Sequence, residues 1–106
     1  MGATNFECVA AGKTAKKAFE TAVKAAQHEH GHSGYTGTIA EKTKFVMISV
    51  PGLSDIKNKE LQRKTAFDFA YSLIDNCDPR VDDKWGPAGC IDLFDGSFLF
   101  FGIASE

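Results

Sequence analysis

The C-terminal run CIDLFDGSFLFFGIA, residues 90–104, is the sequence feature that most limits how this chain can fold. Asp95 and Gly96 lie between two apolar segments, and this dipeptide is typical of a two-residue type I′ turn, in which both central residues take positive φ. The register set by this turn pairs Leu93 with Phe98, Ile91 with Phe100 and Cys90 with Phe101. Both faces of the hairpin are then apolar, so we expect it either to be central in a sheet or to be covered by a partner on its second side.

The N-terminal part of the chain predicts a strand followed by a helix. Residues 5–10 alternate in character, with Phe6, Cys8 and Ala10 on one side of the expected strand. After Thr14 the apolar residues recur at the spacing of one helical face. These residues are Ala15, Ala18, Phe19, Ala22, Val23 and Ala26. Gly31 is suited to end the helix in a left-handed conformation.

The middle of the chain predicts two strands, about Tyr35–Ala40 and Lys44–Val50, joined by a tight turn. A Pro-Gly pair then interrupts the chain, after which Ser54 or Asp55 can cap a second helix. The inner face of that helix is formed by Ala66, Phe69, Ala70, Leu73 and Cys77. A polar loop over residues 76–89 leads into the hairpin.

The element order β-α-β-β-α-β, with one further C-terminal hairpin strand, predicts an α+β fold in a single domain spanning residues 1–106. A mainly antiparallel sheet with both helices on one face would bury both helix stripes, giving a ferredoxin-like two-layer sandwich. The opposite sheet face, with Phe94, Leu99 and Phe101, would be exposed in a monomer. We therefore expect a homodimer, or another protein partner, on that face.

Composition excludes several classes of protein. The chain has 43% hydrophobic and 25% charged residues, as globular proteins do, and no apolar run approaches the ~20 residues that cross a bilayer. The N-terminus lacks the pattern of a secretory signal, so we expect a cytoplasmic protein without membrane association. Three cysteines without CxxC spacing predict buried thiols rather than disulfides or a zinc site. No cofactor is indicated.

Charge is uneven along the chain. Residues 1–64 hold ten Lys/Arg and six Asp/Glu, net +4, whereas residues 65–106 hold two and eight, net −6, for a total of −2. This asymmetry fits an anionic ligand near the first half or head-to-tail association, although solvated helix faces explain most of it. The negative total argues against binding of duplex nucleic acid.

The glycine- and hydroxyl-rich segment after the first helix is the main candidate binding site. Its glycines would let the backbone approach a ligand closely, and its hydroxyl groups can bind phosphate or ribose oxygens. The predicted contacts to an anionic small ligand such as a nucleotide are Lys13, His32, Ser33, Gly34, Tyr35, Thr36, Gly37, Thr38 and Lys42. A plain connection between helix and strand accounts for the same composition equally well.

Two further patterns match known sites only in part. Residues 9–14, VAAGKT, end like a phosphate-binding P-loop, but Glu7 occupies the position of that motif's first glycine. His28 and His32 would lie one turn apart on a continued helix and could share a metal ion, but Gly31 argues against that continuation. A histidine could instead act as a general base near neutral pH. We expect no resident metal.

The stretch GHSGYTGTIAEK, residues 31–42, resembles short uncharacterised proteins of bacteria and their phages, over about a tenth of the chain. The resemblance implies a small accessory protein or host-defence antagonist that acts by binding. Three functions remain open: a binding protein for an anionic small ligand, an interaction module acting through the apolar sheet face, and a small histidine-dependent, metal-assisted enzyme. The sequence leaves catalysis undecided and favours the first function.

Overall fold

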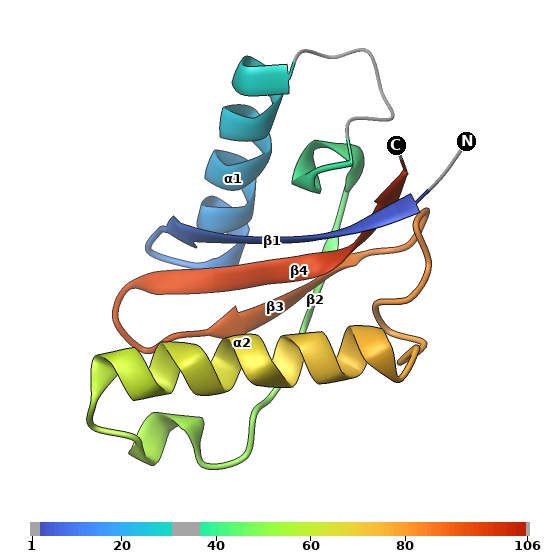
Figure 1. Ribbon diagram of the computed structural model, residues 1–106. Coiled ribbons are helices and arrows are strands. Elements are labelled where there is room, and N and C mark those ends of the chain that lie inside the picture. Colours follow the sequence, from blue (N-terminus) through green and yellow to red (C-terminus); the bar gives the residue numbers. More distant parts are fainter. Residues whose placement is uncertain (1–2, 31–36, 106) are drawn as a thin grey trace.

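The computed structural model describes residues 3–30 and 37–105, which form a four-stranded sheet, two long helices and two 3-10 helices (Figure 1). The elements are β1 (Ala3–Ala11), α1 (Ala15–His30), η1 (Ile39–Glu41), β2 (Phe45–Met47), η2 (Leu53–Asp55), α2 (Lys59–Asp75), β3 (Ala88–Asp92) and β4 (Ser97–Ser105). The strand order is β1-β4-β3-β2, with β4 antiparallel to β1 and β3, and β2 parallel to β3. The α+β class is confirmed, whereas this strand order does not confirm a ferredoxin-like topology.

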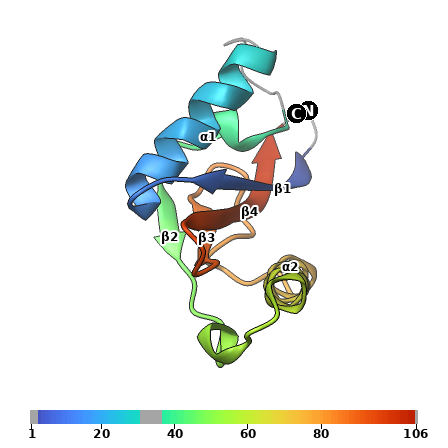
Figure 2. The same ribbon diagram turned by 90° about the vertical axis from the view of Figure 1, so that its left-hand side faces the viewer.

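The two helices cover opposite faces of the sheet, as Figure 2 shows in end view. On one face, Phe100 of β4 packs against Phe19 of α1, with ring centroids 5.6 Å apart. On the other face, Leu99 and Phe101 belong to a separate apolar cluster with Ala66 of α2. The prediction that both helices lie on one face is therefore wrong.

The direction of the two connections explains this arrangement. Strands β1, β2 and β3 are mutually parallel, so both the β1-α1-β2 and the β2-α2-β3 connections are crossovers. The first runs from one sheet edge to the other, and the second runs back towards the centre. Because such crossovers nearly always share one handedness, opposite directions of travel place the two helices on opposite faces.

The predicted strand at Tyr35–Ala40 is the source of the error. Tyr35 and Thr36 lie outside the described residues, and the remainder is not a strand, because Ile39–Glu41 forms η1. The Thr38 side chain caps this turn by accepting a hydrogen bond from Ala40 N. Without that strand there is no central hairpin to bring both helices onto one face.

The β3–β4 hairpin also differs from its prediction, because its loop has three residues rather than two. Leu93 N donates to Ser97 O over 3.1 Å, which leaves residues 94–96 as the loop. Two of these residues are left-handed, Phe94 with φ 59° and Gly96 with φ 85°.

The longer loop shifts the register by one residue. Ile91 now pairs with Leu99, and Cys90 pairs with Phe100. A shift of one residue exchanges the two faces of a strand. The shift places Ile91 and Leu93 on the same face as Leu99 and Phe101. Because α2 covers this face, Leu99 and Phe101 are fully buried instead of exposed, which removes the reason for expecting a partner there.

The second helix begins later than predicted. Asn58, rather than Ser54 or Asp55, caps α2 by accepting hydrogen bonds from Glu60 N and Leu61 N. At the other end the helix stops before Cys77, which is left-handed with φ 54°.

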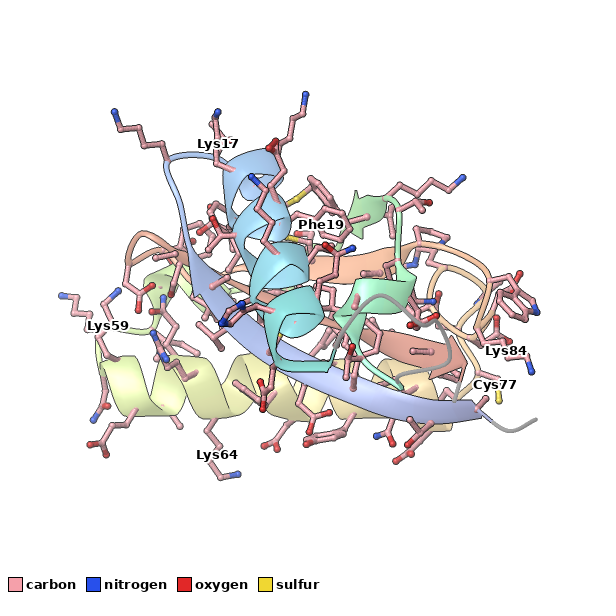
Figure 3. The ribbon with its side chains drawn as sticks, turned by 90° about the horizontal axis from the view of Figure 1, so that it is seen from above. Lys17, Phe19, Lys59, Lys64, Cys77 and Lys84 are labelled. Carbon is pink, nitrogen blue, oxygen red and sulfur yellow. The ribbon has the colours of Figure 1, made fainter. Side chains whose placement is uncertain are left out.

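The predicted burial of the three thiols is correct for one of them. Cys90 is buried and Cys8 is half-buried, whereas Cys77 is exposed beyond the C-terminal end of α2 (Figure 3). Among the described helices, none has the length and apolar character needed to span a bilayer.

Candidate functional site

A cleft of about 440 Å³ lies between β1, α1 and η1. Alternation along β1 turns Phe6, Cys8 and Ala10 towards α1, as the sequence predicts, and these residues pack at the core beneath that helix. The cleft is lined by Phe6, Glu7, Cys8, Val9 and Ala10 of β1, Thr21, Ala22, Ala25, Ala26 and Glu29 of α1, and Thr38 and Ile39. Three consecutive elements of the chain thus meet around one mainly apolar space.

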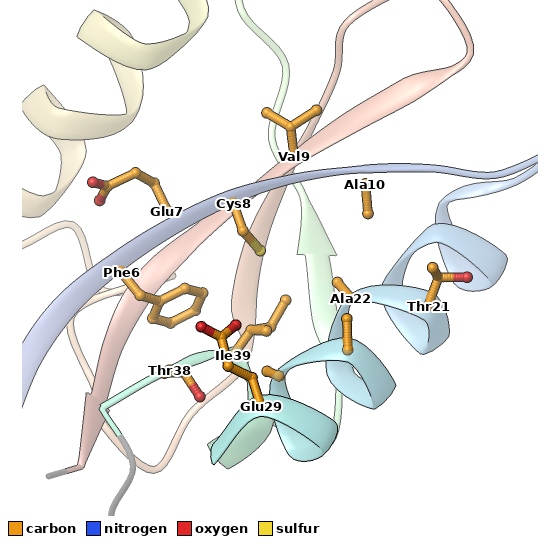
Figure 4. Close-up of a pocket in the computed structure, with 12 residues that line it drawn as sticks. Phe6, Glu7, Cys8, Val9, Ala10, Thr21, Ala22, Glu29, Thr38 and Ile39 are labelled. Atoms are coloured by element: carbon orange, nitrogen blue, oxygen red, sulfur yellow. The ribbon is translucent and has the colours of Figure 1, made fainter.

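The small side chains of α1 create this space. Where α1 faces β1, positions 22, 25 and 26 are all alanine. A leucine at such a position would reach the strand, whereas the single methyl group of alanine leaves a gap. Figure 4 shows Phe6 and Cys8 pointing from β1 into the region bounded by Ala22 and Ile39.

The thiol of Cys8, which lines the cleft, is unreactive at neutral pH. Burial, with a smaller contribution from the charge of Glu7, raises the pKa of Cys8 to about 11. Because the thiolate is the nucleophile, a thiol with this pKa stays protonated at neutral pH. Cys8 therefore acts as an apolar contact in the cleft.

The charged residues that line the cleft are both acidic. Glu7 sits on the β1 side, and its carboxylate accepts a hydrogen bond of 2.9 Å from the Tyr71 hydroxyl of α2. Glu29 extends from α1 over the cleft towards β1 (Figure 4). Because the Glu7 carboxylate points away from the cleft to the α2 face, Glu29 alone disfavours an anionic guest there and favours a neutral or cationic one.

The structure describes four of the nine predicted ligand-binding residues. His32, Ser33, Gly34, Tyr35 and Thr36 lie outside the described residues. Of the remaining four, only Thr38 lines the cleft. Gly37 is left-handed with φ 71° at the approach to η1, and Lys13 is exposed at the turn between β1 and α1.

Lys42 has a structural role. Its side chain is almost fully buried, and its Nζ donates to the carbonyl oxygens of Asp83, Lys84 and Gly86 at 3.2, 3.2 and 2.9 Å. An ammonium group has three donors, so these carbonyls use all of them. Burial lowers the pKa of Lys42, and the charge of Asp83 opposes that shift. Lys42 thus holds the 83–86 turn and has no donor left for a ligand.

The P-loop-like segment is an ordinary helix start. Thr14 accepts a hydrogen bond of 3.2 Å from Lys17 N, as a capping residue does. Gly12 lies so close to α1 that a Cβ there would stand 2.6 Å from Ala18 N. Lys17 extends from this first turn into solvent (Figure 3). This glycine is needed for helix packing rather than for approach to a phosphate.

The histidines give no metal centre within the described part of the chain. His28 is exposed on α1, and His32 lies outside the described residues. No three His, Cys, Asp or Glu side chains of residues 3–30 and 37–105 come together as a group that could hold a metal ion.

A second hollow, of about 390 Å³, lies at the opposite edge of the sheet beside β2. Met47 and Phe94 border it and are 49% and 51% exposed. Its remaining lining comes mostly from the turn over residues 48–54. The cleft beside β1 is better suited to a compact guest, because it is walled by a strand and a helix.

Apart from Thr38, the residues that line the β1–α1 cleft were not predicted as site residues. The available signal was the run of alanines on α1, where a helix that only fills a core would have larger side chains. Comparisons of the chain with protein-family models, with curated proteins and with solved structures found no significant match. Its function must therefore follow from the geometry of the described residues.

Proposed function

We propose that this chain is a small binding protein that holds a compact, mainly apolar guest in the cleft between β1, α1 and η1. The observation that carries the proposal is the cleft itself, about 440 Å³ with a lining drawn from three elements. Ligand sites in proteins measure roughly 300–1,000 Å³ and combine apolar walls with a few polar groups. Thr38 and Glu29 supply the polar groups here.

The carboxylate of Glu29, which extends over the cleft, supports a neutral or cationic guest. Binding of a nucleotide by residues 32–38 stays a prediction about a segment outside the described residues, and the cleft lends it no support. The alternative function as an interaction module required an exposed apolar sheet face. That face is not exposed at Leu99 and Phe101, because α2 covers them.

Thermal unfolding with matched indole compounds tests the proposal. Tryptamine and indole-3-acetate share one ring system and differ in charge, and a cyclic nucleotide represents the anionic alternative. A guest present at about 100 times its dissociation constant adds about 2.7 kcal/mol to the free energy of unfolding. We expect a larger shift of the unfolding temperature with tryptamine than with indole-3-acetate, and a shift only with the cyclic nucleotide would refute the proposal.

A cavity-filling variant tests whether the guest binds in the cleft. Ala26→Leu fills the cleft, so it should stabilise the free protein, by about 0.5–2 kcal/mol, and remove the effect of tryptamine. Lys24→Leu puts the same side chain on an exposed position of α1 that does not line the cleft. This control should keep the tryptamine effect, and equal effects of tryptamine on both variants would show that it binds elsewhere.

A further inference from the structure

Within the described residues, strand β1 presents an open edge. It is nine residues long and lies at one end of the strand order, paired on one side with β4. Its register with β4 is continuous from Ala3 to Ala11, so it has no bulge, and it contains no proline and only one charged residue, Glu7. Proteins usually protect edge strands with bulges, prolines or several charges, because an open edge pairs with other strands. This edge lacks those protections.

Two backbone hydrogen bonds of the sheet determine which β1 residues face outwards. Gly12 N donates to Gly96 O over 3.2 Å, which continues the β1–β4 register. In an antiparallel pair, hydrogen-bonded and non-hydrogen-bonded residues alternate, so even-numbered β1 residues bond to β4. The bond from Leu93 N to Ser97 O agrees, because it turns the odd-numbered residues of β4 towards β3. The outward backbone groups of β1 therefore belong to Asn5, Glu7, Val9 and Ala11.

We propose that a second copy of this chain adds to that edge, with the two β1 strands antiparallel about a two-fold axis at Val9. Each four-stranded sheet would then continue into the other. The outward N–H and C=O groups of one strand would pair with the same groups of the other, as an isologous interface requires.

Charge complementarity selects both the partner and the register. Full overlap of the two strands would place Glu7 of one copy opposite Glu7 of the other, so the two carboxylates would repel each other. A register with Glu7 opposite Val9 would leave the two carboxylates as diagonal neighbours, which also repel. With Val9 opposite Val9, Glu7 lies opposite Ala11, and Lys13 of the other copy follows two residues further along. Glu7 of each copy then lies near Lys13 of the other copy, and the two-fold axis gives two such pairs.

The same edge borders the cleft, because Glu7 and Val9 belong to its lining. The second copy's strand would run along the open side of the cleft. The dimer does not require a guest, so it can be tested on the free protein.

Sedimentation of the full chain over a concentration series, with two proline variants, tests the surface. Ala11→Pro removes an outward N–H, and Ala10→Pro removes an N–H that bonds to β4. We expect a dimer for the unchanged chain and a folded monomer for Ala11→Pro. Ala10→Pro should unfold at a lower temperature, which checks the assignment of outward residues. A chain that is monomeric at every concentration, or a dimer unaffected by Ala11→Pro, would overturn the proposal.

Charge exchange tests the register without a backbone change. Glu7→Lys and Lys13→Glu should each raise the dimer dissociation constant by about tenfold at low salt, and the double variant should restore it. Tyr71→Phe removes the hydrogen bond to Glu7 without changing charge, so it should leave dimerisation unchanged. Additive loss in the double variant would overturn the proposed register.

Discussion

The Phe101 ring lies directly over Gly89, its partner across the β3–β4 ladder. A Cβ placed on Gly89 would stand 2.6 Å from Phe101 Cζ and 2.9 Å from Val81 Cγ1, closer than Cβ atoms in proteins approach non-bonded atoms. The aromatic ring therefore occupies the space that a side chain on β3 would need. We expect Gly89→Ala to lower the free energy of unfolding by about 1–3 kcal/mol, the usual cost of overpacking a core, as measured by urea denaturation.

A double-mutant cycle identifies the cause. Phe101→Leu alone removes buried ring contacts and should destabilise the fold. The double variant Gly89→Ala/Phe101→Leu should lose less free energy of unfolding than the sum of the two single variants, because the smaller Leu side chain relieves the clash with the new Cβ. Strict additivity would show that the two residues are not in steric conflict.

Lys42 is predicted to be a stabilising residue of the 83–86 turn. Lys42→Met keeps most of the apolar stem but removes the three hydrogen bonds to backbone carbonyls. Hydrogen bonds to a charged group contribute about 1.5–3 kcal/mol, so we expect a loss of about 2 kcal/mol in chemical denaturation. Lys44→Met, at an exposed position nearby, serves as the control and should change stability by less than about 0.5 kcal/mol. Equal effects of the two changes would contradict the structural role of Lys42.

Asp78 gives the fold a dependence on acid pH. Hydrogen bonds from the Arg80 side chain and then its backbone lower the pKa of Asp78 from 3.8 to about 2. Since the pKa is lower in the folded state, the unfolded chain binds more protons between these values, and stability rises with pH. The contribution is present above pH 3.8 and is lost as the pH falls through about 2.

Unfolding temperatures of the unchanged chain and of Asp78→Asn, measured across this pH range, test the assignment. The difference between them should be largest above pH 3.8 and should shrink towards pH 2. Arg80→Gln removes the partner and should weaken the same pH dependence. A difference that stays constant with pH would mean that Asp78 acts through something other than its charge.

Local periodicity was enough to predict β1 and α1. The alternation of Phe6, Cys8 and Ala10 and the helical stripe containing Phe19 and Ala22 depend only on neighbours in sequence, and both are found in the structure. The larger arrangement depends on how many strands separate the two helices. The predicted strand at Tyr35–Ala40 overlaps η1 in the structure. This one additional strand led to the prediction that both helices lie on the same face.

The hairpin register shows a second limit. A two-residue and a three-residue loop differ by a single position, and the sequence around Asp95 and Gly96 suits the shorter one. The observed loop places Phe94 at a left-handed φ of 59°, which few aromatic residues adopt. Tertiary contacts support it, since Lys59 Nζ donates to Phe94 O over 3.1 Å. Such a contact between α2 and the loop cannot be seen in the local sequence.

The cleft between β1 and α1 was not predicted, for a related reason. Glycines and hydroxyl groups are typical of ligand-binding loops, whereas alanines on the apolar face of a helix are typical of an ordinary core. Only packing of α1 across β1 shows that Ala22 and Ala26 leave space between the two elements.

Amide chemical-shift mapping with tryptamine is the most direct test of the cleft as a binding site. The account predicts saturable shifts at residues 6–10 of β1, at residues 21–29 of α1 and at Thr38 and Ile39, all of which disappear in Ala26→Leu. Saturable shifts that instead gather around Met47 and Phe94, or that persist unchanged in Ala26→Leu, would contradict it.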